Sequence, residues 1–423
     1  MEPRELLLGS FQAALAAADP LRIVPPQLPH PPRGRTVVVG AGKAAASMAL
    51  AVETHWPAKA PLEGVVITRY GHGLPTKRIR VIEAGHPVPD EQGEAAAREI
   101  LALARALGED DLLLALVSGG GSSLLALPVP GVSMADLKAV TRALLASGAP
   151  IQDMNTVRKH LSAIQGGRLA AATRARALAL VISDVTGDDP THIASGPCTP
   201  DPTTYGDAIE ILRRYGVDAP APVRAHLERG VRGSEPETPK PGEAVLAHAE
   251  TRVIATAHAS LEAGAAWLRE RGVPAMILGD TITGEAAEVA KVLAAIAREV
   301  RVHGQPAKAP LALVSGGETT VTVRGRGRGG RNTQFLLSLA IALDLQGATW
   351  ALSCGTDGID GTEDNAGAIV APDTLPRGAH AGLDARRMLE DNDAYTFFEK
   401  LGDLVVTGPT RTNVNDYRVI LVA

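Results

Sequence analysis

Short apolar segments that end in glycine recur along the chain. The longest is LLLALVSGGGSS at residues 112–123, in which six apolar residues precede a serine, three glycines and two further serines. Six apolar residues in a row are typical of a strand buried on both faces of a sheet, and glycines permit the sharp turn that follows. The pattern returns as LALVSGGETT at residues 311–320 and, in shorter form, as TVVVGAGK at residues 36–43.

Alternation of such strands with helices predicts an α/β protein. Ligands of open α/β sheets bind beyond the carboxyl ends of the strands, so we expect the glycine-ended strands to border one crevice. Helices are expected at 94–107, 155–165 and 284–299, among others. Further strands are expected at 64–68, 79–82, 177–182, 251–256, 275–278, 350–353, 404–406 and 417–422.

The length of 423 residues favours two domains. The best candidate for a linker is GVRGSEPETPKPG at residues 230–242, which is polar and carries three prolines. We therefore expect a first domain at 1–235, a linker at 236–248 and a second domain at 249–423.

Composition and charge exclude several classes of protein. The net charge of -5 argues against nucleic-acid or membrane-surface partners, and no apolar segment reaches transmembrane length. The two cysteines, Cys198 and Cys354, show no metal-ligand spacing and indicate a reducing compartment, so we expect a cytoplasmic protein. The N-terminus carries Glu2, Glu5 and Asp19 among apolar residues, which predicts an amphipathic helix rather than a signal peptide.

A strand, a glycine-rich turn and a helix start leave backbone N–H groups unpaired and directed at one point, where a phosphate or carboxylate can bind. Glycines are also common in such turns for structural reasons alone, but the repeated Ser-Gly-Gly favours binding. The candidate anion-binding residues are Gly40, Gly42, Ser118, Gly119, Gly120, Gly121, Ser122, Ser123, Gly316, Gly317 and Glu318.

Gly40, Gly42 and Ala45 fit the dinucleotide-binding pattern G-x-G-x-x-[GA], so a nicotinamide cofactor must be considered. That pattern requires an acid at the end of the next strand to hold the ribose, and Arg69 stands there instead. The mismatch weakens the dinucleotide hypothesis. It makes Lys43 the more informative residue, because a cation in the first turn of a helix would lie beside a phosphate site; a solvated surface lysine is the alternative.

Two other segments bring cations together. The expected helix 155–165 carries Arg158 and Lys159, which either meet an anionic group or form a solvated basic face. Residues 324–331 alternate arginine with glycine and predict a mobile, cationic loop that closes over phosphates, with Arg331 nearest the next helix. An RNA-binding segment is the alternative, and the acidic net charge and scarcity of aromatic residues argue against it.

Acidic residues follow two of the expected strands. Asp184 comes directly after one strand, with Asp188 and Asp189 in the same loop, as suits a Mg²⁺ site or a general base. The alternative is that these acids form turns and helix caps. Asp357, Asp360 and Asn365 lie in a glycine-rich loop that does not match the EF-hand spacing, and they could contact a divalent ion or substrate hydroxyls. His86 is either a loop brace or a substrate contact.

The chain contains, in order and nearly from end to end, VGAGKAA, GHPVPDEQG, VSGGGSS, NTVRKHLSAIQGGRLA, ISDVTGDDP, SGP, SGGETTVTV, GGRN, GTDGIDG and TGPTRTNVND. Together these segments resemble the glycerate 2-kinases of the MOFRL type, once often described as hydroxypyruvate reductases. The resemblance implies two three-layer α/β/α domains with a cleft between them. It implies a Rossmann-like parallel sheet in the larger N-terminal domain and a mixed sheet in the smaller C-terminal one. It also implies transfer of phosphate from ATP to D-glycerate, giving 2-phosphoglycerate, with Mg²⁺ or Mn²⁺.

Carried over to this chain, the resemblance implies that Lys43 and Arg331 are the cations at the transferring phosphate and that residues 118–123 form the anion cradle. It implies that Asp184 is a base or a metal-associated carboxylate. The candidate magnesium ligands are Asp184, Asp188 and Asp189. The candidate substrate-binding residues are His86, Arg158, Lys159, Asn332 and Asp357.

The chain departs from the family pattern at a few positions. Gln165 stands where lysine is usual, Thr333 and Gln334 stand where the family has GGRNQE, and Arg411 stands where it has TGPTGTN. These residues could alter the contacts around Arg331 and the choice of substrate.

Three functions remain open from the sequence. The first is a kinase, monomeric or homodimeric, that acts on small molecules alone. The second is a NAD(P)H-dependent hydroxypyruvate reductase, and the third is a non-catalytic sugar-phosphate binding protein.

Overall fold

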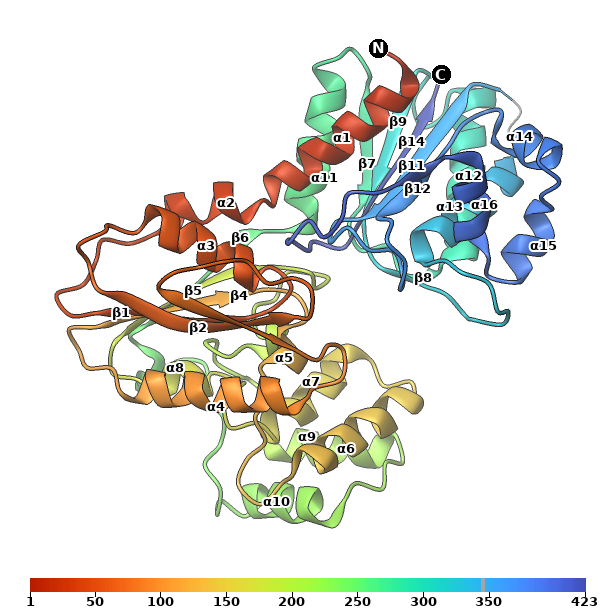
Figure 1. The fold of residues 1–423 in the computed structure, drawn as a ribbon. Helices are drawn as coiled ribbons and strands as arrows, with labels where there is room; N and C mark the ends of the chain where they lie inside the picture. The colour runs from red at the N-terminus through yellow and green to blue at the C-terminus, as the bar shows by residue number, and fades with distance from the viewer. Residues whose placement is uncertain (344–346) are drawn as a thin grey trace. The chain divides into compact units, whose positions relative to one another are not determined.

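The computed structural model describes residues 1–343 and 347–423. Its contacts divide the chain into two compact units. The N-terminal unit is Pro20–Ile254, and the C-terminal unit combines Met1–Asp19 with Ala255–Ala423. Each contains a six-stranded sheet with helices on both faces (Figure 1). The prediction of an α/β protein with two three-layer parts is confirmed.

The sheet of the N-terminal unit has the strand order β3-β2-β1-β4-β5-β6, which is the order of the Rossmann fold. The neighbours from β3 to β5 pair in parallel. All residues of β1 and of β4 are buried, because helices cover both faces. The strands are β1 (Thr36–Ala41), β2 (Leu62–Arg69), β3 (Ile79–Ala84), β4 (Leu112–Val117), β5 (Arg176–Ile182) and β6 (Ala249–Ala255).

Helices α3 and α4 lie on opposite faces of this sheet (Figure 1). Helices α6, α7, α9 and α10 form a separate group with its own apolar core, which includes Leu137, Leu144, Val157 and Tyr205. The helices of the unit are α2 (Pro20–Ile23), α3 (Ala45–His55), α4 (Glu91–Arg105), α5 (Gly121–Leu124), α6 (Met134–Ala146), α7 (Ile151–His160), α8 (Arg168–Ala171), α9 (Tyr205–Arg214) and α10 (Ala221–Val231).

Helix α7 differs from the helix expected at 155–165, because it begins at Ile151 and ends at His160. Beyond it, Ser162 forms a β-bridge with Pro128, and the Ser162 hydroxyl accepts the N–H of Gln165 at 3.1 Å. This side chain replaces a helical acceptor, so the chain turns toward the β4 loop instead of continuing the helix.

The sheet of the C-terminal unit has the order β13-β12-β11-β14-β9-β7 and is mixed, as the family resemblance implies. Only β7 and β9 pair in parallel, and the other neighbours are antiparallel. The strand β12 lies in the loop-like segment 355–370 and was not expected. The strands are β7 (Ala275–Gly279), β9 (Leu311–Ser315), β11 (Thr349–Gly355), β12 (Gly367–Val370), β13 (Leu404–Val405) and β14 (Asp416–Val422).

Helices α1 and α11 cover one face of this sheet, and α12, α13 and α16 cover the other (Figure 1). Strands β8 (Gly284–Glu285) and β10 (Thr319–Thr320) form a small separate pair. The helices are α1 (Pro3–Ala17), α11 (Ala257–Arg269), α12 (Ala286–His303), α13 (Arg331–Leu343), α14 (Thr374–His380), α15 (Ala385–Glu390) and α16 (Ala394–Leu401).

The two units do not coincide with the division expected at 1–235 and 249–423. Helix α1 belongs to the C-terminal unit, because its buried Leu7 and Phe11 share one apolar core with Leu261 of α11. The segment expected as a linker is fastened to the N-terminal unit, since Pro239 O accepts the N–H of Asp201. Strand β6 then completes the first sheet.

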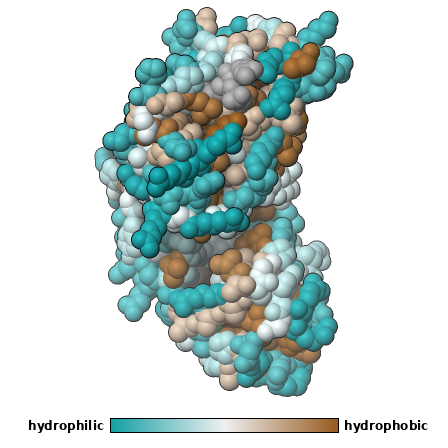
Figure 2. Space-filling model, turned by 90° about the vertical axis from the view of Figure 1, so that its right-hand side faces the viewer, coloured by the Kyte–Doolittle hydropathy of each residue, from teal (hydrophilic) through white to brown (hydrophobic). Residues whose placement is uncertain are grey.

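Figure 2 shows one face of the molecule, which is mostly hydrophilic, with hydrophobic residues in small separate groups. Among the exposed apolar side chains are Val88 and Leu145. No helix within the described ranges is long and apolar enough to cross a membrane.

Candidate active site

The loops that follow β1 and β4 are hydrogen-bonded to each other at the carboxyl edge of the first sheet. The N–H of Lys43 donates to Gly119 O at 2.8 Å, and the N–H of Ala44 donates to Ser118 Oγ at 3.0 Å. The approach is so close that a Cβ on Gly42 would lie 2.1 Å from Ser118 Oγ. The glycine at this position is therefore required for packing one loop against the other.

In a dinucleotide-binding loop, the backbone N–H groups at these positions bind the pyrophosphate. Here the same N–H groups are occupied by hydrogen bonds to neighbouring loops and strands. The N–H groups of Lys43 and Ala44 go to the β4 loop, and that of Gly42 goes to a backbone oxygen of β2. A Cβ on Gly40 would lie 2.0 Å from a backbone oxygen of β4, so this glycine also serves packing. The geometry therefore gives Gly40 and Gly42 a structural role and does not favour a nicotinamide dinucleotide at this loop.

The β4 loop, residues 118–123, keeps its donors available. The N–H groups of Gly121 and Ser123 bond to oxygens within the loop. In contrast, no described residue accepts a hydrogen bond from the N–H groups of Gly119, Gly120 and Ser122. Gly120 has a left-handed φ of 80°, a conformation that lets successive N–H groups converge on an anion. The anion cradle at this loop stays a prediction, and these N–H groups are the donors that it would use.

Two of the candidate side chains border this loop. A Cβ on Gly120 would lie 2.8 Å from His86 Nε2 and 3.6 Å from Lys43 Cγ. The imidazole of His86 and the aliphatic stem of Lys43 therefore lie against the same loop residue. The structure brings together three of the elements that the sequence marked separately: the β1 loop, the 85–90 segment and the β4 loop.

A turn with unusual backbone geometry packs against the same loop. Ala194 and Ser195 have φ values of 50° and 59°, a left-handed conformation that side chains other than glycine adopt only at a cost. The buried Ser195 hydroxyl lies 3.0 Å from that of Ser122 and donates to Asn155 Oδ1 at 3.3 Å. A Cβ on Gly121 would meet the Cβ of Ala194 at 2.5 Å. The turn holds the β4 loop in place, and the sequence did not mark Ser195 or Asn155.

Arg158 and Lys159 are neighbours in α7 with different surroundings. Lys159 is fully buried, and its Nζ donates to the buried carboxylate of Asp201 at 2.8 Å. It stabilises the fold and is not presented to a substrate. The guanidinium of Arg158 donates to Asn155 Oδ1 at 3.4 Å, and no carboxylate of the described residues lies within ion-pair distance of it. Burial lowers the pKa of Arg158, as expected for a cation that lacks a counter-charge.

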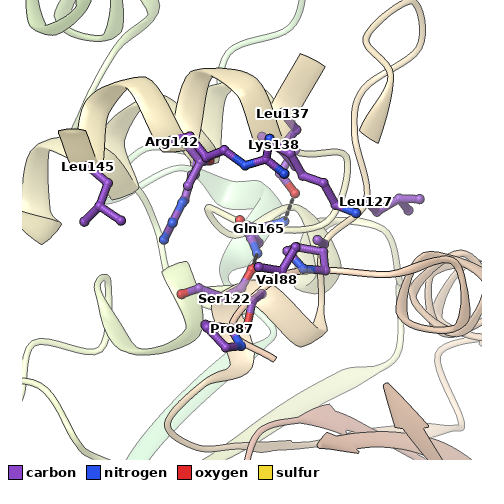
Figure 3. Close-up of a pocket in the computed structure, with 15 residues that line it drawn as sticks. Pro87, Val88, Ser122, Leu127, Leu137, Lys138, Arg142, Leu145 and Gln165 are labelled. Carbon is purple, nitrogen blue, oxygen red and sulfur yellow. Dashed lines mark hydrogen bonds between the residues drawn. The ribbon is translucent and has the colours of Figure 1, made fainter. Parts of the chain in front are cut away.

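Arg158 lines a cavity of about 190 Å³ together with Ser122 and Ser123 of the β4 loop. The cavity lies between α6 and the turn at residues 87–89 (Figure 3). Gln165 braces this region, since its Nε2 donates to Ser122 O at 2.9 Å and to Leu125 O at 3.2 Å. The β4 loop is thus continuous with a pocket that contains an unneutralised cation.

The acids after β5 do not form a closed metal site. Asp184 follows the strand next to β4 and is partly buried. Asp189 is exposed; burial acts to raise its pKa, but hydrogen bonds from Thr191 outweigh this and lower it. No three His, Cys, Asp or Glu side chains in the described ranges are grouped closely enough to hold a metal ion. Mg²⁺ often takes only one or two carboxylates together with substrate phosphates, so Asp184 suits that kind of site better than a protein cage.

A second charged cluster lies in the C-terminal unit, around Arg331 at the start of α13. Arg331 Nε donates to Asp416 at 2.9 Å, and its Nη1 donates to Glu318 at 2.6 Å. The buried carboxylate of Asp416 also accepts from Arg418 at 2.7 Å and from the Asn332 amide at 3.1 Å. Burial acts to lower the pKa of Arg331, but the two carboxylates outweigh it and raise the pKa. Arg331 is therefore a permanently charged and firmly oriented group.

Asp360 holds the first turn of α13. Its carboxylate accepts the N–H groups of Asn332 and Thr333 at 2.8 and 2.9 Å, and the Thr333 hydroxyl at 2.8 Å. Burial raises the pKa of Asp360. Asp357 is also buried, and its Oδ1 accepts the N–H of Ile359 at 3.1 Å. The loop 355–365 thus positions Arg331 and Asn332 through Asp360.

Three of the residues that depart from the family pattern make hydrogen bonds that support the structure. Thr333 completes the cap made by Asp360, and Gln334 Nε2 donates to Leu389 O at 3.0 Å. Gln165 braces the β4 loop as described above. Arg411 has a left-handed φ of 59° in the turn before β14.

The arginine–glycine segment 324–330 is not a detached lid. Its backbone is hydrogen-bonded along its length to residues 391–393, for example from Gly327 N to Asp391 O at 2.8 Å and from Arg328 N to Asp393 Oδ1 at 2.9 Å. A Cβ on Gly325 would lie 2.2 Å from Asp391 O. The glycines therefore serve this contact, while the arginines alternate outward. The expected mobile loop is a fastened one.

The sequence did not predict the roles of several residues that shape these two clusters: Asn155, Ser195, Asp201, Asp416 and Arg418. The only signal for Asp416 and Arg418 was the polar segment NVNDYR, in which strand β14 begins. Each acts through contacts with residues distant in the chain, which no local pattern records.

Comparison with known proteins places these features in a family. Residues 6–228 match a domain of unknown function, DUF4147, and residues 311–416 match the MOFRL family. A glycerate 2-kinase of Pyrococcus horikoshii is 40% identical, over 100% of this chain and 98% of that protein. A protein of Agrobacterium vitis, provisionally named a hydroxypyruvate reductase, is 54% identical, over 99% of this chain and 94% of that protein.

The crystal structure of a glycerate kinase from Thermotoga maritima has a TM-score of 0.88 with this chain at 40% sequence identity. The alignment covers 99% of each chain. The similarity therefore extends through both units.

Proposed function

Because the chain belongs to the family that carries the DUF4147 and MOFRL domains and includes glycerate kinases, we propose that it transfers the terminal phosphate of ATP to the C2 hydroxyl of D-glycerate. The products are 2-phosphoglycerate and ADP. The family relation supports the reaction class, and the residues around the β4 loop support the chemistry.

The observation that carries the proposal is the β4 loop itself. Its N–H groups at Gly119, Gly120 and Ser122 have no acceptor among the described residues, and Lys43 and Arg158 bring positive charge to its surroundings. Phosphoryl transfer depends on positioning and charge stabilisation more than on covalent chemistry. A loop of convergent donors with nearby cations meets both needs.

In this proposal the loop binds phosphate oxygens, and Lys43 and Arg331 are the cations of the transferring phosphate. The C2 oxygen of glycerate forms a bond to the terminal phosphorus as the bond to the ADP oxygen breaks, and the hydroxyl proton leaves to a carboxylate. Asp184 is the proposed acceptor of that proton, or a ligand of Mg²⁺ or Mn²⁺. The metal ion, when bound with the triphosphate, would neutralise part of its charge. His86, Asn332 and Asp357 remain proposed substrate contacts.

We place the protein in the cytoplasm as a monomer or homodimer that acts on small molecules. Cys198 and Cys354 are buried free thiols, which fits a reducing compartment.

A coupled assay of ADP release with D-glycerate, followed by identification of the phosphorylated product, tests the proposal. We expect ADP release that depends on glycerate, with the phosphate on C2. Lys43→Ala and Arg331→Ala should each lower kcat by roughly a hundredfold or more. Lys59→Ala is the matched control, since Lys59 is exposed and makes none of these contacts. Near-normal turnover in both active-site variants would remove these residues from the mechanism.

The reductase is the second candidate, because the relative from Agrobacterium vitis carries that name. The pairing of the Gly42, Lys43 and Ala44 N–H groups argues against it. Oxidation of NADH or NADPH by the pure protein with hydroxypyruvate, followed by absorbance, would establish it in place of the kinase.

A further inference from the structure

The cavity beside the β4 loop has apolar side chains on two sides. Leu137 and Leu145 of α6 lie on one side of it, and Val88 lies on the other (Figure 3). Val88 and Leu145 are 54% and 66% exposed, an unusual state for aliphatic side chains that border a pocket. Such walls suit a flat, apolar group better than a three-carbon hydroxy acid, whose atoms are nearly all polar.

The same cavity has a cationic side. Lys138 and Arg142 stand one turn apart on α6, and Arg158 reaches the cavity from α7. No carboxylate of the described residues lies within ion-pair distance of these cations, and no acid lines the cavity. Figure 3 shows Lys138 and Arg142 on the helix that faces Val88 and Ser122. A ligand that fits must combine an apolar part with negative charge.

Gln165 adds a hydrogen-bond acceptor to the cavity. Both hydrogens of its amide donate to backbone oxygens, at 2.9 and 3.2 Å. Its Oε1 is therefore the part of the amide that a ligand can use, and it accepts hydrogen bonds. An exocyclic amino group, such as that of adenine, matches this acceptor.

We propose that this cavity binds the base and ribose of the nucleotide, with the phosphates extending past Arg158 to the N–H groups of the β4 loop. The inference rests on the proposed kinase function and adds to it the location of the nucleoside. The apolar wall holds the base, the cations of α6 and α7 meet the phosphates, and Ser122 and Ser123 connect the two parts because they belong both to the cavity and to the loop.

Filling the cavity tests the proposal. Thr141 lines the cavity from α6, whereas Ala139 on the same helix is exposed and does not line it. Thr141→Tyr should raise the KM for ATP at least tenfold, while kcat at saturation and the KM for glycerate change less than about twofold. Ala139→Tyr places the same side chain outside the cavity and should leave all three values unchanged.

Calorimetric titration distinguishes binding of the nucleoside from binding of the phosphates, and it does not require turnover. Thr141→Tyr should weaken binding of ADP at least tenfold and leave binding of inorganic pyrophosphate unchanged. Equal weakening of pyrophosphate, a rise in the KM for glycerate alone, or unchanged ADP binding would each overturn the proposal.

The two proposals can fail separately. If the wild type releases no ADP with glycerate but binds ADP in a way that Thr141→Tyr abolishes, the kinase function fails and the nucleoside site stands. If turnover is normal in Thr141→Tyr at low ATP, the kinase function stands and the nucleoside site lies elsewhere.

Discussion

The peptide LALVSGG occurs twice, at residues 114–120 in the N-terminal unit and at 311–317 in the C-terminal unit, and the two copies have different chemistry. Both begin as buried strands, β4 and β9. The loop after β4 offers N–H groups that no described residue accepts. In the loop after β9, the N–H of Gly316 donates to Gly279 O at 2.8 Å, Gly316 O accepts from Arg418 at 2.8 Å, and Gly317 O accepts the N–H of Asp416 at 3.2 Å.

The difference comes from the neighbouring strands. Strand β4 lies between β1 and β5, which both run parallel to it, so loops and helix starts gather at its carboxyl end. Strand β9 lies beside β14, which runs antiparallel and pairs Arg418 with Ser315. The beginning of β14 therefore brings Asp416 and Arg418 to the second loop. Corresponding residues of the two loops therefore meet different partners, because the neighbouring strands run in different directions.

The largest expected effect concerns the charge network of the second loop. Asp416 is buried and pairs with both Arg331 and Arg418. Asp416→Ala leaves two arginines without this carboxylate, and breaking a buried pair in this way costs about 3–5 kcal/mol. Urea unfolding should show this loss. An unchanged free energy of unfolding would mean that the network does not hold the second loop.

At the first loop, we expect loss of a cation to lower activity and to leave stability nearly unchanged. Arg158→Met removes a cation that has no carboxylate partner, so the stability should change by less than about 0.5 kcal/mol. Loss of a charged hydrogen bond to the anionic substrate should lower kcat/KM by about tenfold or more. Lys159→Met, one residue further on, removes the partner of buried Asp201 and should be strongly destabilising. Similar stability losses in both variants would contradict this contrast.

A pH dependence is expected from Asp360 in the cluster beside the second loop. Burial raises its pKa above the ordinary value of 3.8, so the folded protein keeps a proton that the unfolded chain has released. The contribution of Asp360 to stability therefore falls as pH rises from about 4 upward. Asp360→Asn should remove this contribution. The difference between variant and wild type in urea midpoints, followed from about pH 4 to about pH 7, measures it, and parallel profiles would refute it.

Within the charge network of the second loop, the smallest effect on stability is expected at Glu318. This residue follows LALVSGG in the second loop, where the first loop has a glycine. Its side chain is 53% exposed, and it pairs with Arg331. Glu318→Gln should cost less than about 1 kcal/mol, because exposed ion pairs are screened by water. This variant also serves as a control for Asp416→Ala, since both remove a carboxylate partner of Arg331. A loss as large as that of Asp416→Ala would show that Glu318 holds the cluster.

Much of the fold was predictable where one local rule applied. The strand at 112–117 matches β4 in the structure, because a run of six apolar residues is typical of a strand buried on both faces. The prediction of an anion cradle came from the same segment. The helix at 155–165 was misplaced because Ser162 pairs with Pro128, which is distant in the chain. The roles of Arg158 and Lys159 were equally hidden, since the partner Asp201 lies 42 positions away.

By itself, the sequence determined most of the buried strands, although not β12, together with the glycine turns after several of them and the residue types that can bind phosphate. These follow from hydrophobic periodicity and from the conformational freedom of glycine, which are local properties. Only the tertiary structure decided which partners the two LALVSGG turns meet and which cations are neutralised. Hydrogen bonds and charge pairs join residues far apart in the chain, so the direction of a neighbouring strand decides what each turn meets.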